Sequence, residues 1–156
     1  MKYPADHTTV SSHMAARQSP LGSQLFYLVD HVAHELHTAM HEVLAAKNLH
    51  NRQYATLALI AGKHTVTQHT LSKVLNLDPS QVVTLVKSLV DRNLVTRRTL
   101  ESDRRAKILS ITEDGLRLYS DMEAQLRQVE ETVTASLSRR DRKILATLLD
   151  RILPPT

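Results

Sequence analysis

Residues Thr67–Thr112 read TQHTLSKVLNLDPSQVVTLVKSLVDRNLVTRRTLESDRRAKILSIT, and the order of the elements in this segment sets the architecture of the chain. The segment holds two short helical patterns, followed by two stretches rich in Val, Ile and Thr, Leu94–Arg98 and Lys107–Ile111. These stretches flank a charged turn, so they predict a β-hairpin. A helix of the size that enters the DNA major groove, with a basic hairpin beside it, is suited to gripping duplex DNA.

The second helical pattern has a clear start and a clear end. Asp78 supplies a capping carboxylate, Pro79 occupies the first helical position and Gln81 the third, as in a capping box. Asn93 follows at a point where the chain needs a left-handed conformation, which Asn tolerates. The sequence therefore predicts a helix that ends near Arg92.

The excess positive charge of the chain is concentrated in one segment. The chain carries 20 Lys and Arg residues against 16 Asp and Glu residues, a net charge of +4. Between Lys87 and Lys107 there are seven basic and three acidic residues, and the remaining 13 basic and 13 acidic residues cancel. A local excess of this kind is the electrostatic signature expected of a phosphate-binding surface.

Apolar residues at helical spacing predict four further helices. These run from Ser23 to about Ala46, from a cap at Asn51 to Gly62, from Thr112 through Val133, and from about Arg140 to the stop at Pro154-Pro155. The predicted fold class is mainly α with a small two-stranded β wing. It is a winged helix-turn-helix with dimerisation helices at its N-terminal and C-terminal ends.

We expect a flexible, polar N-terminal arm over residues 1–20 and a single domain over residues 21–156. Within this domain the winged helix-turn-helix covers about 51–112, and the dimerisation helices cover about 21–47 and 112–153. The apolar stripes of the terminal helices are too long for a small winged domain to cover, so burial in a twofold homodimer is the simplest solution. Such a dimer presents two DNA-reading helices roughly 34 Å apart, which matches a palindromic operator.

The helix over residues 78–92 separates polar from apolar side chains. At about 100° per residue, its polar side chains fall within an arc of roughly 120°, and the Val and Leu side chains, Val83 included, fill the opposite side. Hydroxyl and amide side chains read base edges, and a lysine suits guanine or phosphate. A merely solvated face is the alternative, but such faces are usually richer in Glu and Lys. The polar set is Ser80, Gln81, Thr84, Lys87, Ser88 and Asp91.

Further DNA contacts are expected around this helix. Arg104 and Arg105 at the hairpin turn suit a narrow minor groove, and Asp103 can pair with one of the two arginines and fix its direction. Beyond the turn, we expect phosphate contacts or ion pairs from Arg97, Arg98 and Lys107, and backbone N–H contacts to phosphate from Thr67 and Gln68.

Five motifs of the chain resemble the multiple antibiotic resistance regulator (MarR) family: LSKVLNLDPSQVV (71–83), LVKSLV (85–90), LVTR (94–97), DRRAK (103–107) and LSITEDG (109–115). The resemblance implies a homodimeric transcriptional repressor that releases duplex DNA when a small, often phenolic or lipophilic effector binds. The effector cleft of the family lies between the dimerisation helices and the DNA-reading lobe. One departure is Asn93, where the family usually has Gly.

Four histidines of the first predicted helix, His31, His34, His37 and His41, lie within an arc of about 120°. Three interpretations stay open: a solvated helix side, hydrogen-bond partners in the effector cleft, and a site for zinc or another divalent metal. The metal interpretation makes His34, His37 and His41 the ligands of a metal-responsive regulator. The zinc-sensing branch of the family takes further histidines from the helix after the wing, and residues 117–136 contain none. The effector-binding candidates are His34, His37, His41 and Tyr54.

Composition excludes several kinds of site. The chain has no Cys, which removes disulfides, thiolate metal sites and cysteine redox sensing. Aromatic residues make up 3% with no Trp, which argues against single-strand binding by base stacking. Three glycines and no recognisable nucleophile motif predict that the chain is not an enzyme and needs no cofactor beyond an effector of unknown identity. No segment approaches transmembrane length, so we expect a cytoplasmic protein without a membrane partner.

Overall fold

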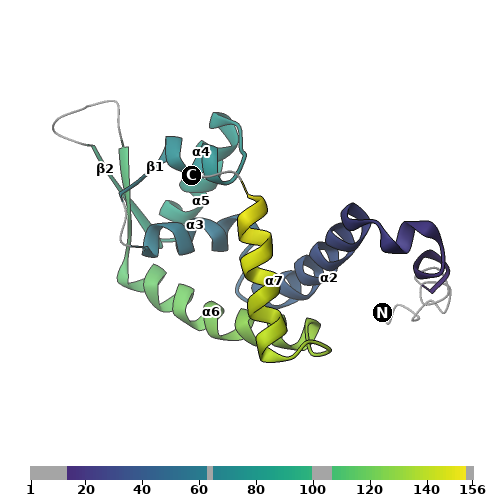
Figure 1. Cartoon of the computed structure of the whole chain (residues 1–156). Helices are drawn as coiled ribbons and strands as arrows, with labels where there is room; N and C mark the ends of the chain where they lie inside the picture. Colours follow the sequence, from purple (N-terminus) through teal and green to yellow (C-terminus); the bar gives the residue numbers. More distant parts are fainter. Residues whose placement is uncertain (1–13, 63–64, 100–106, 154–156) are drawn as a thin grey trace, which may run out of the picture. The chain divides into compact units, whose positions relative to one another are not determined.

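The structure, a computed structural model, describes residues 14–62, 65–99 and 107–153 (Figure 1). The chain forms two compact units, which divide between Thr38 and Ala39 inside helix α2 (Leu25–Ala45). The described residues are mainly helical and carry a small antiparallel sheet, which confirms the fold class predicted from the sequence. Among the described residues, no helix is long and apolar enough to cross a membrane.

The N-terminal unit contains the short helix η1 (Pro20–Ser23) and the first part of α2. Ser19 caps η1, because its hydroxyl accepts a hydrogen bond from the Leu21 N–H at 3.2 Å. Tyr27 and His31, one turn apart on α2, form an edge-to-face contact with ring centroids 4.2 Å apart. The long helix predicted for this part of the chain is confirmed.

The C-terminal unit holds the rest of α2 and the remaining elements (Figure 1). In chain order these are α3 (Asn51–Ala61), β1 (Val66–Thr67), α4 (Gln68–Val74), α5 (Pro79–Asp91), β2 (Val95–Thr99), β3 (Lys107–Ile111), α6 (Glu113–Val133) and α7 (Arg139–Ile152). Helices α4 and α5 form the helix-turn-helix, and the β2–β3 hairpin that follows them is the wing.

The sheet joins the wing to the start of the helix-turn-helix. Its described strands lie in the order β1-β3-β2, and both pairs are antiparallel. Val95 of β2 lies opposite Ile111, and Val66 of β1 lies opposite Leu109. The sequence predicts the hairpin but not β1, because a two-residue strand leaves no alternation to detect.

Side-chain caps specify where α4 and α5 begin. The Thr67 hydroxyl accepts a hydrogen bond from the Thr70 N–H at 3.1 Å. At α5, Gln81 Oε1 accepts a hydrogen bond from the Asp78 N–H at 3.2 Å. Both predicted helix starts are confirmed, as is the left-handed conformation of Asn93, whose φ is 56°.

The start of α3 differs from the prediction. His50, rather than Asn51, precedes the helix with an extended backbone, and Asn51 is its first helical residue. Gln53 Oε1 accepts a hydrogen bond from the His50 N–H at 2.9 Å, which is the glutamine half of a capping box. Asn51 was predicted as the N-cap because Asn is a common residue at that position. The prediction was wrong because Gln53, at the third helical position, fixes the start of the helix through its bond to the His50 N–H.

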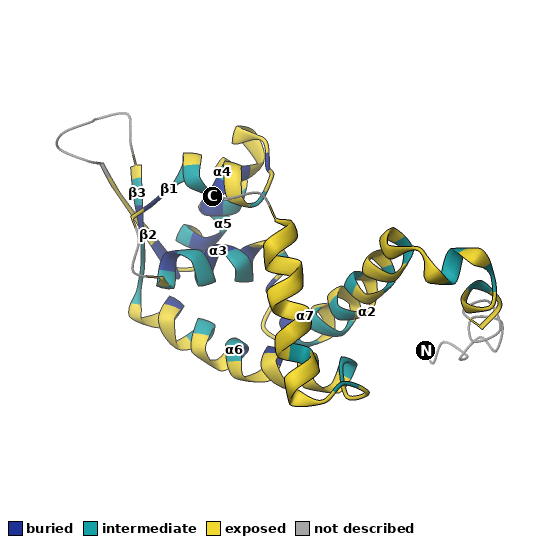
Figure 2. Cartoon of the chain, viewed as in Figure 1, coloured by how far each residue is buried: buried dark blue, intermediate teal, exposed yellow. Residues whose placement is uncertain are grey.

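The buried apolar side chains of the described residues form one cluster in the C-terminal unit (Figure 2). Helix α5 contributes Val82, Val86 and Leu89, which are 1%, 0% and 0% exposed. Burying each such side chain stabilises the fold by about 1.5–3 kcal/mol. The other members are Leu44, Leu49, Leu57, Ile60, Val66, Leu71, Leu77, Leu94, Val95, Leu109, Met122 and Leu126. One side of α5 therefore packs into the core, and its other side is exposed to solvent.

Helix α6 passes close to the base of the wing at Gly115. A Cβ atom at this position would lie 2.1 Å from the Leu94 carbonyl oxygen and 2.9 Å from Ile111 Cγ1. The same carbonyl accepts a hydrogen bond from the Thr112 N–H at 3.1 Å. The Thr112 hydroxyl accepts another from the Gly115 N–H at 3.0 Å. This approach requires a residue without a side chain, and it positions the wing against α6.

Candidate nucleic-acid interface

Helix α5 presents a polar face to solvent. Ser80, Gln81, Thr84, Lys87 and Asp91 are all exposed on it. Because the opposite side of α5 is packed into the core, the positions of these side chains are set before any partner binds. The face combines hydroxyl, amide and ammonium groups, which are the groups that reach base edges and phosphates in DNA complexes.

Two side chains of α5 lie where the helical periodicity did not place them. Ser88 is half-buried, and its hydroxyl accepts a hydrogen bond from Gln53 Nε2 at 3.0 Å and donates one to the Leu85 carbonyl at 2.7 Å. Ser88, predicted as a DNA contact, is less accessible than the other polar side chains of α5, because α3 packs against that edge of the helix. Val83, predicted on the apolar side, is 50% exposed, because no part of the chain that the structure describes covers the opposite edge.

Lys87 carries its charge beside an acidic neighbour. Its Nζ lies 2.6 Å from Asp91 Oδ2, one helical turn away, and both side chains are exposed. An exposed pair of this kind contributes little to stability. The pair instead sets the direction of the Lys87 side chain, because the Asp91 carboxylate holds the ammonium group on the exposed face of α5.

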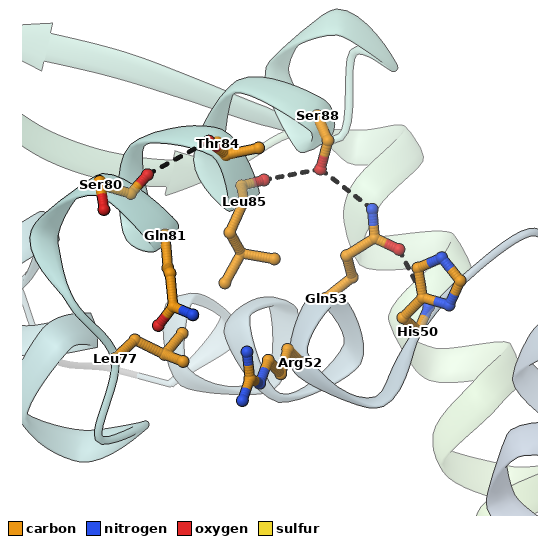
Figure 3. A pocket seen from close by; sticks show the side chains of 9 residues that line it. All are labelled: His50, Arg52, Gln53, Leu77, Ser80, Gln81, Thr84, Leu85 and Ser88. Carbon is orange, nitrogen blue, oxygen red and sulfur yellow. Dashed lines mark hydrogen bonds between the residues drawn. The ribbon is translucent and has the colours of Figure 1, made fainter.

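A cleft of about 690 Å³ lies between α5 and the N-terminal part of α3 (Figure 3). Gln81 points into it from α5 and Arg52 points into it from α3 (Figure 3). None of the described side chains that line the cleft is acidic, and no described carboxylate lies within ion-pair distance of Arg52. The lining residues are His50, Arg52, Gln53, Leu77, Ser80, Gln81, Thr84, Leu85 and Ser88.

A chain of hydrogen bonds closes one end of this cleft (Figure 3). The side chain of Gln53, which is 8% exposed, accepts from the His50 N–H and donates to the Ser88 hydroxyl. The buried amide thus has partners for both of its polar atoms and ties the start of α3 to the middle of α5. Sequence reasoning missed Arg52 and Gln53, because nothing in their local pattern shows that α3 packs beside α5.

The wing supplies further positive charge. Arg97 and Arg98 on β2 and Lys107 on β3 are exposed. The candidates at the wing tip, Asp103, Arg104 and Arg105, lie outside the described residues.

The start of α4 is arranged differently from the expectation for Thr67 and Gln68. The Thr67 N–H donates to the Thr70 hydroxyl at 3.3 Å, so it is already used in the cap of α4. Thr67 and Gln68 are both half-buried. A phosphate at this position would have to compete with the cap for the Thr67 N–H.

Of the effector candidates, Tyr54 lines a second, smaller cavity of about 260 Å³. Its ring stacks on that of Tyr119, with centroids 5.8 Å apart and an interplanar angle of 24°. Burial raises the pKa of the Tyr54 phenol above its ordinary value of 10.0, and Tyr119 and Glu123 add to this effect. The phenol therefore stays protonated as a hydrogen-bond donor. The cavity is lined by Met40, Tyr54, Glu123, Leu126, Arg127 and Glu130.

The candidate histidines do not line this cavity. His41 is exposed and stacks on His50, with ring centroids 6.4 Å apart and an interplanar angle of 8°. His34 and His37 are exposed on the part of α2 that belongs to the N-terminal unit. Within the described ranges, no three His, Cys, Asp or Glu side chains are grouped so as to hold a metal ion.

Comparison with known proteins gives the family. A model of the MarR family matches residues 47–106, from the end of α2 to the wing. A solved transcriptional regulator of the MarR family from Rhodococcus sp. RHA1 is 29% identical, with a TM-score of 0.80 over 89% of this chain and 98% of that one. This chain belongs to the MarR family. The family and the winged fold predicted from the motifs are thereby confirmed.

Two other known proteins resemble this chain. CouR from Rhodococcus jostii RHA1, solved with bound p-coumaroyl-CoA, is 30% identical, with a TM-score of 0.78 over 89% of this chain and 97% of CouR. A protein of Thauera aromatica assigned to transcriptional regulation of the hcr operon is 29% identical over 99 residues, which are 64% of this chain and 60% of that protein. The chain thus matches less than two thirds of the length of this second relative.

Proposed function

We propose that this MarR-family protein is a sequence-specific regulator that binds duplex DNA as a homodimer on a palindromic operator. It represses transcription until a small-molecule effector releases it. The observation that carries the proposal is the exposed polar face of α5, which the buried core holds in place beside the cleft around Arg52.

In this proposal, the side chains of α5 read base edges from the major groove. Ser80, Gln81 and Thr84 offer donors and acceptors, and Lys87 serves guanine or phosphate. Gln81 pairs bidentately with adenine when its Oε1 exchanges the Asp78 N–H for the base. Ser88 acts through its bond to Gln53 and holds α5 in position. Around the helix, Arg97, Arg98 and Lys107 contact phosphates, and the backbone N–H of Gln68 on α4 contacts another. Arg104 and Arg105 enter the minor groove, and Asp103 pairs with one of them and fixes its direction.

Arg52 extends the proposed interface beyond the helix-turn-helix. Its guanidinium group points into a cleft without acidic side chains, next to Gln81 on the opposite wall (Figure 3). An arginine with no carboxylate partner among the described residues, beside the base-reading face, is well placed to take a backbone phosphate of the operator. We therefore count Arg52 among the DNA contacts, although the helix that carries it is not part of the recognition motif.

The homodimer is supported by apolar side chains that the described chain leaves exposed. Large apolar side chains left exposed in such number mark an interaction site. We propose that the helices over about 21–47 and 112–153 bury it against a second copy, and that residues 21–156 work as one functional domain. Figure 2 shows α7 exposed along most of its length. The residues are Leu25, Phe26, Leu28, Val29 and Val32 in the N-terminal unit, and Ile144, Leu145, Leu148, Leu149, Ile152 and Leu153 at α7.

The effector response is supported by the cavity beside Tyr54. A dry cavity of about 150 Å³ holds benzene, so a volume of about 260 Å³ suits a small aromatic molecule. The Tyr54 phenol supplies a hydrogen-bond donor for a phenolic group on it, and Glu123, paired with Arg127 at 3.6 Å, supplies an acceptor. CouR, which is 30% identical, was solved with an aromatic acyl-CoA bound. On the metal alternative, which uses His34, His37 and His41, zinc or a chelator would change operator affinity, and we expect neither to do so.

The test is binding of the purified protein to the DNA upstream of its own gene, across a salt series, with scrambled DNA of the same composition as control. We expect selective binding that weakens steeply with salt, since each phosphate contact contributes about −0.9 to the logarithmic slope. Thr84→Ala should reduce selectivity, and Arg104→Ala/Arg105→Ala should reduce affinity and slope. Equal, weak binding to both DNAs, unchanged in the variants, would rule out the regulator proposal.

A further inference from the structure

One apolar side chain lies on the polar face of α5. Val83 is 50% exposed, whereas Val82 and Val86 on the same helix are 1% and 0% exposed. Val83 belongs neither to the buried cluster nor to the partly buried side chains packed against it. Its methyl groups therefore contribute little to the core and are free to meet a partner.

Helical spacing places Val83 at the edge of the row of proposed base readers. Residues three and four apart are neighbours on a helix surface, so Val83 lies beside Ser80 and Lys87, and it directly precedes Thr84. All three of these side chains are exposed. DNA that contacts Ser80 and Lys87 therefore passes next to the side chain of Val83.

We propose that Val83 reads the C5-methyl group of one thymine in each half-site of the operator, an inference that rests on the proposed DNA-binding function. The thymine methyl is the apolar group that base pairs present in the major groove. Valine is stiff about χ1 in a helix, so its methyl groups are held in place before DNA binds. A purine at this point would set a polar N7, O6 or N6 atom against these methyls and deprive it of a hydrogen bond to water, whereas cytosine would present only C5–H and lose the methyl contact.

Deoxyuridine tests this contact, because it pairs as thymidine does and lacks only the C5-methyl group. Footprinting first locates the operator, and each thymine of a half-site is then replaced in turn. At one position of the half-site, replacing thymidine by deoxyuridine should lower the affinity of the wild-type protein about fourfold per half-site. This factor corresponds to one lost methyl contact. Val83→Ala should lose a similar factor on the unmodified operator and nothing further on the operator with deoxyuridine at that position.

Val74→Ala is the matched control, because Val74 is a valine of similar exposure, 52%, that lies on α4. It should bind both operators as the wild-type protein does. Val83→Thr keeps the shape of the side chain and one methyl group. Its affinity for the unmodified operator should therefore lie between the affinities of the wild-type protein and of Val83→Ala. The Tm of Val83→Ala should equal that of the wild-type protein. If it is lower, Val83→Thr is compared on the two operators in its place.

Two outcomes would overturn the assignment. The first is unchanged affinity of Val83→Ala for the unmodified operator. The second is a loss in Val83→Ala that persists on every deoxyuridine operator, which would show that the protein and DNA changes act independently. If the wild-type protein binds its operator selectively, either result rejects only the role of Val83 and leaves the proposed DNA-binding function standing. Absence of selective binding by the wild-type protein removes the proposed function itself.

Discussion

Replacing Gly115 by alanine sets helix propensity against steric overlap, and the local geometry shows which effect wins. At an open helical position this change stabilises a protein by about 1 kcal/mol, because alanine loses less backbone entropy than glycine. At Gly115 the added Cβ would lie 2.1 Å from the Leu94 carbonyl oxygen. That oxygen belongs to the backbone and cannot rotate away.

The overlap sets the size of the expected loss. A carbon and a carbonyl oxygen approach to about 3.3 Å at closest, so α6 and the start of β2 would have to separate by about 1 Å. Overpacking of this kind costs about 1–3 kcal/mol or more. The movement also stretches the hydrogen bond from the Thr112 N–H to Leu94, 3.1 Å long, which contributes about 1 kcal/mol. After the helix-propensity gain of about 1 kcal/mol is subtracted, we expect a net loss of about 1–3 kcal/mol, or roughly 2–12 °C in Tm.

The assay is urea and thermal unfolding at one fixed protein concentration, since a homodimer unfolds in a concentration-dependent way. Gly62→Ala is the matched control, because Gly62 has a φ of −61° and the nearest atom to an added Cβ is 3.2 Å away. Its stability should change by less than about 1 kcal/mol. Operator affinity of Gly115→Ala should also fall, because β2 carries Arg97 and Arg98. A Gly115→Ala protein as stable as wild type, with unchanged affinity, would refute the reasoning.

Arg52→Ala should lower operator affinity and reduce the logarithmic salt slope by about one, whereas Arg139→Ala, on α7, should change neither; equal slopes for the two variants would place the cleft away from DNA. Burial raises the pKa of Tyr54 above 10.0. A group whose pKa is raised on folding stabilises the folded state below its unfolded pKa, so stability should fall as the pH rises above about 10, and Tyr54→Phe should flatten that fall in urea unfolding. An identical alkaline profile in the variant would contradict this. Leu148→Glu should convert the proposed homodimer to monomer in sedimentation velocity, while Thr147→Glu, the adjacent polar position on α7, should leave it dimeric; a dimer in both would show that α7 lies outside the interface.

Much of this architecture could be predicted because its signals are local. The starts of α4 and α5 are encoded by Thr67 and by the Asp78–Gln81 box, and each cap forms within one helical turn. The left-handed turn at Asn93 is equally local. The concentration of charge between Lys87 and Lys107 needs no structure at all.

The errors lie where a distant element determines the outcome. Ser88 and Val83 sit at opposite edges of the polar face of α5, and their positions in the sequence are equally ambiguous. Ser88 is half-buried because α3, more than thirty residues earlier in the chain, brings Gln53 to its hydroxyl. Val83 is exposed because none of the described elements packs on its side. Helical periodicity defines the faces of a helix, but not which edge a neighbouring helix will cover.

The amino-acid sequence alone specifies the helices, the wing, the polar face of α5 and the family, because propensities, caps and charges act over a few residues. The cleft around Arg52, the link from Gln53 to Ser88 and the exposure of Val83 depend on how α3 packs beside α5. Those features belong to tertiary structure, because burial is a property of pairs of elements and no single segment encodes its own neighbour.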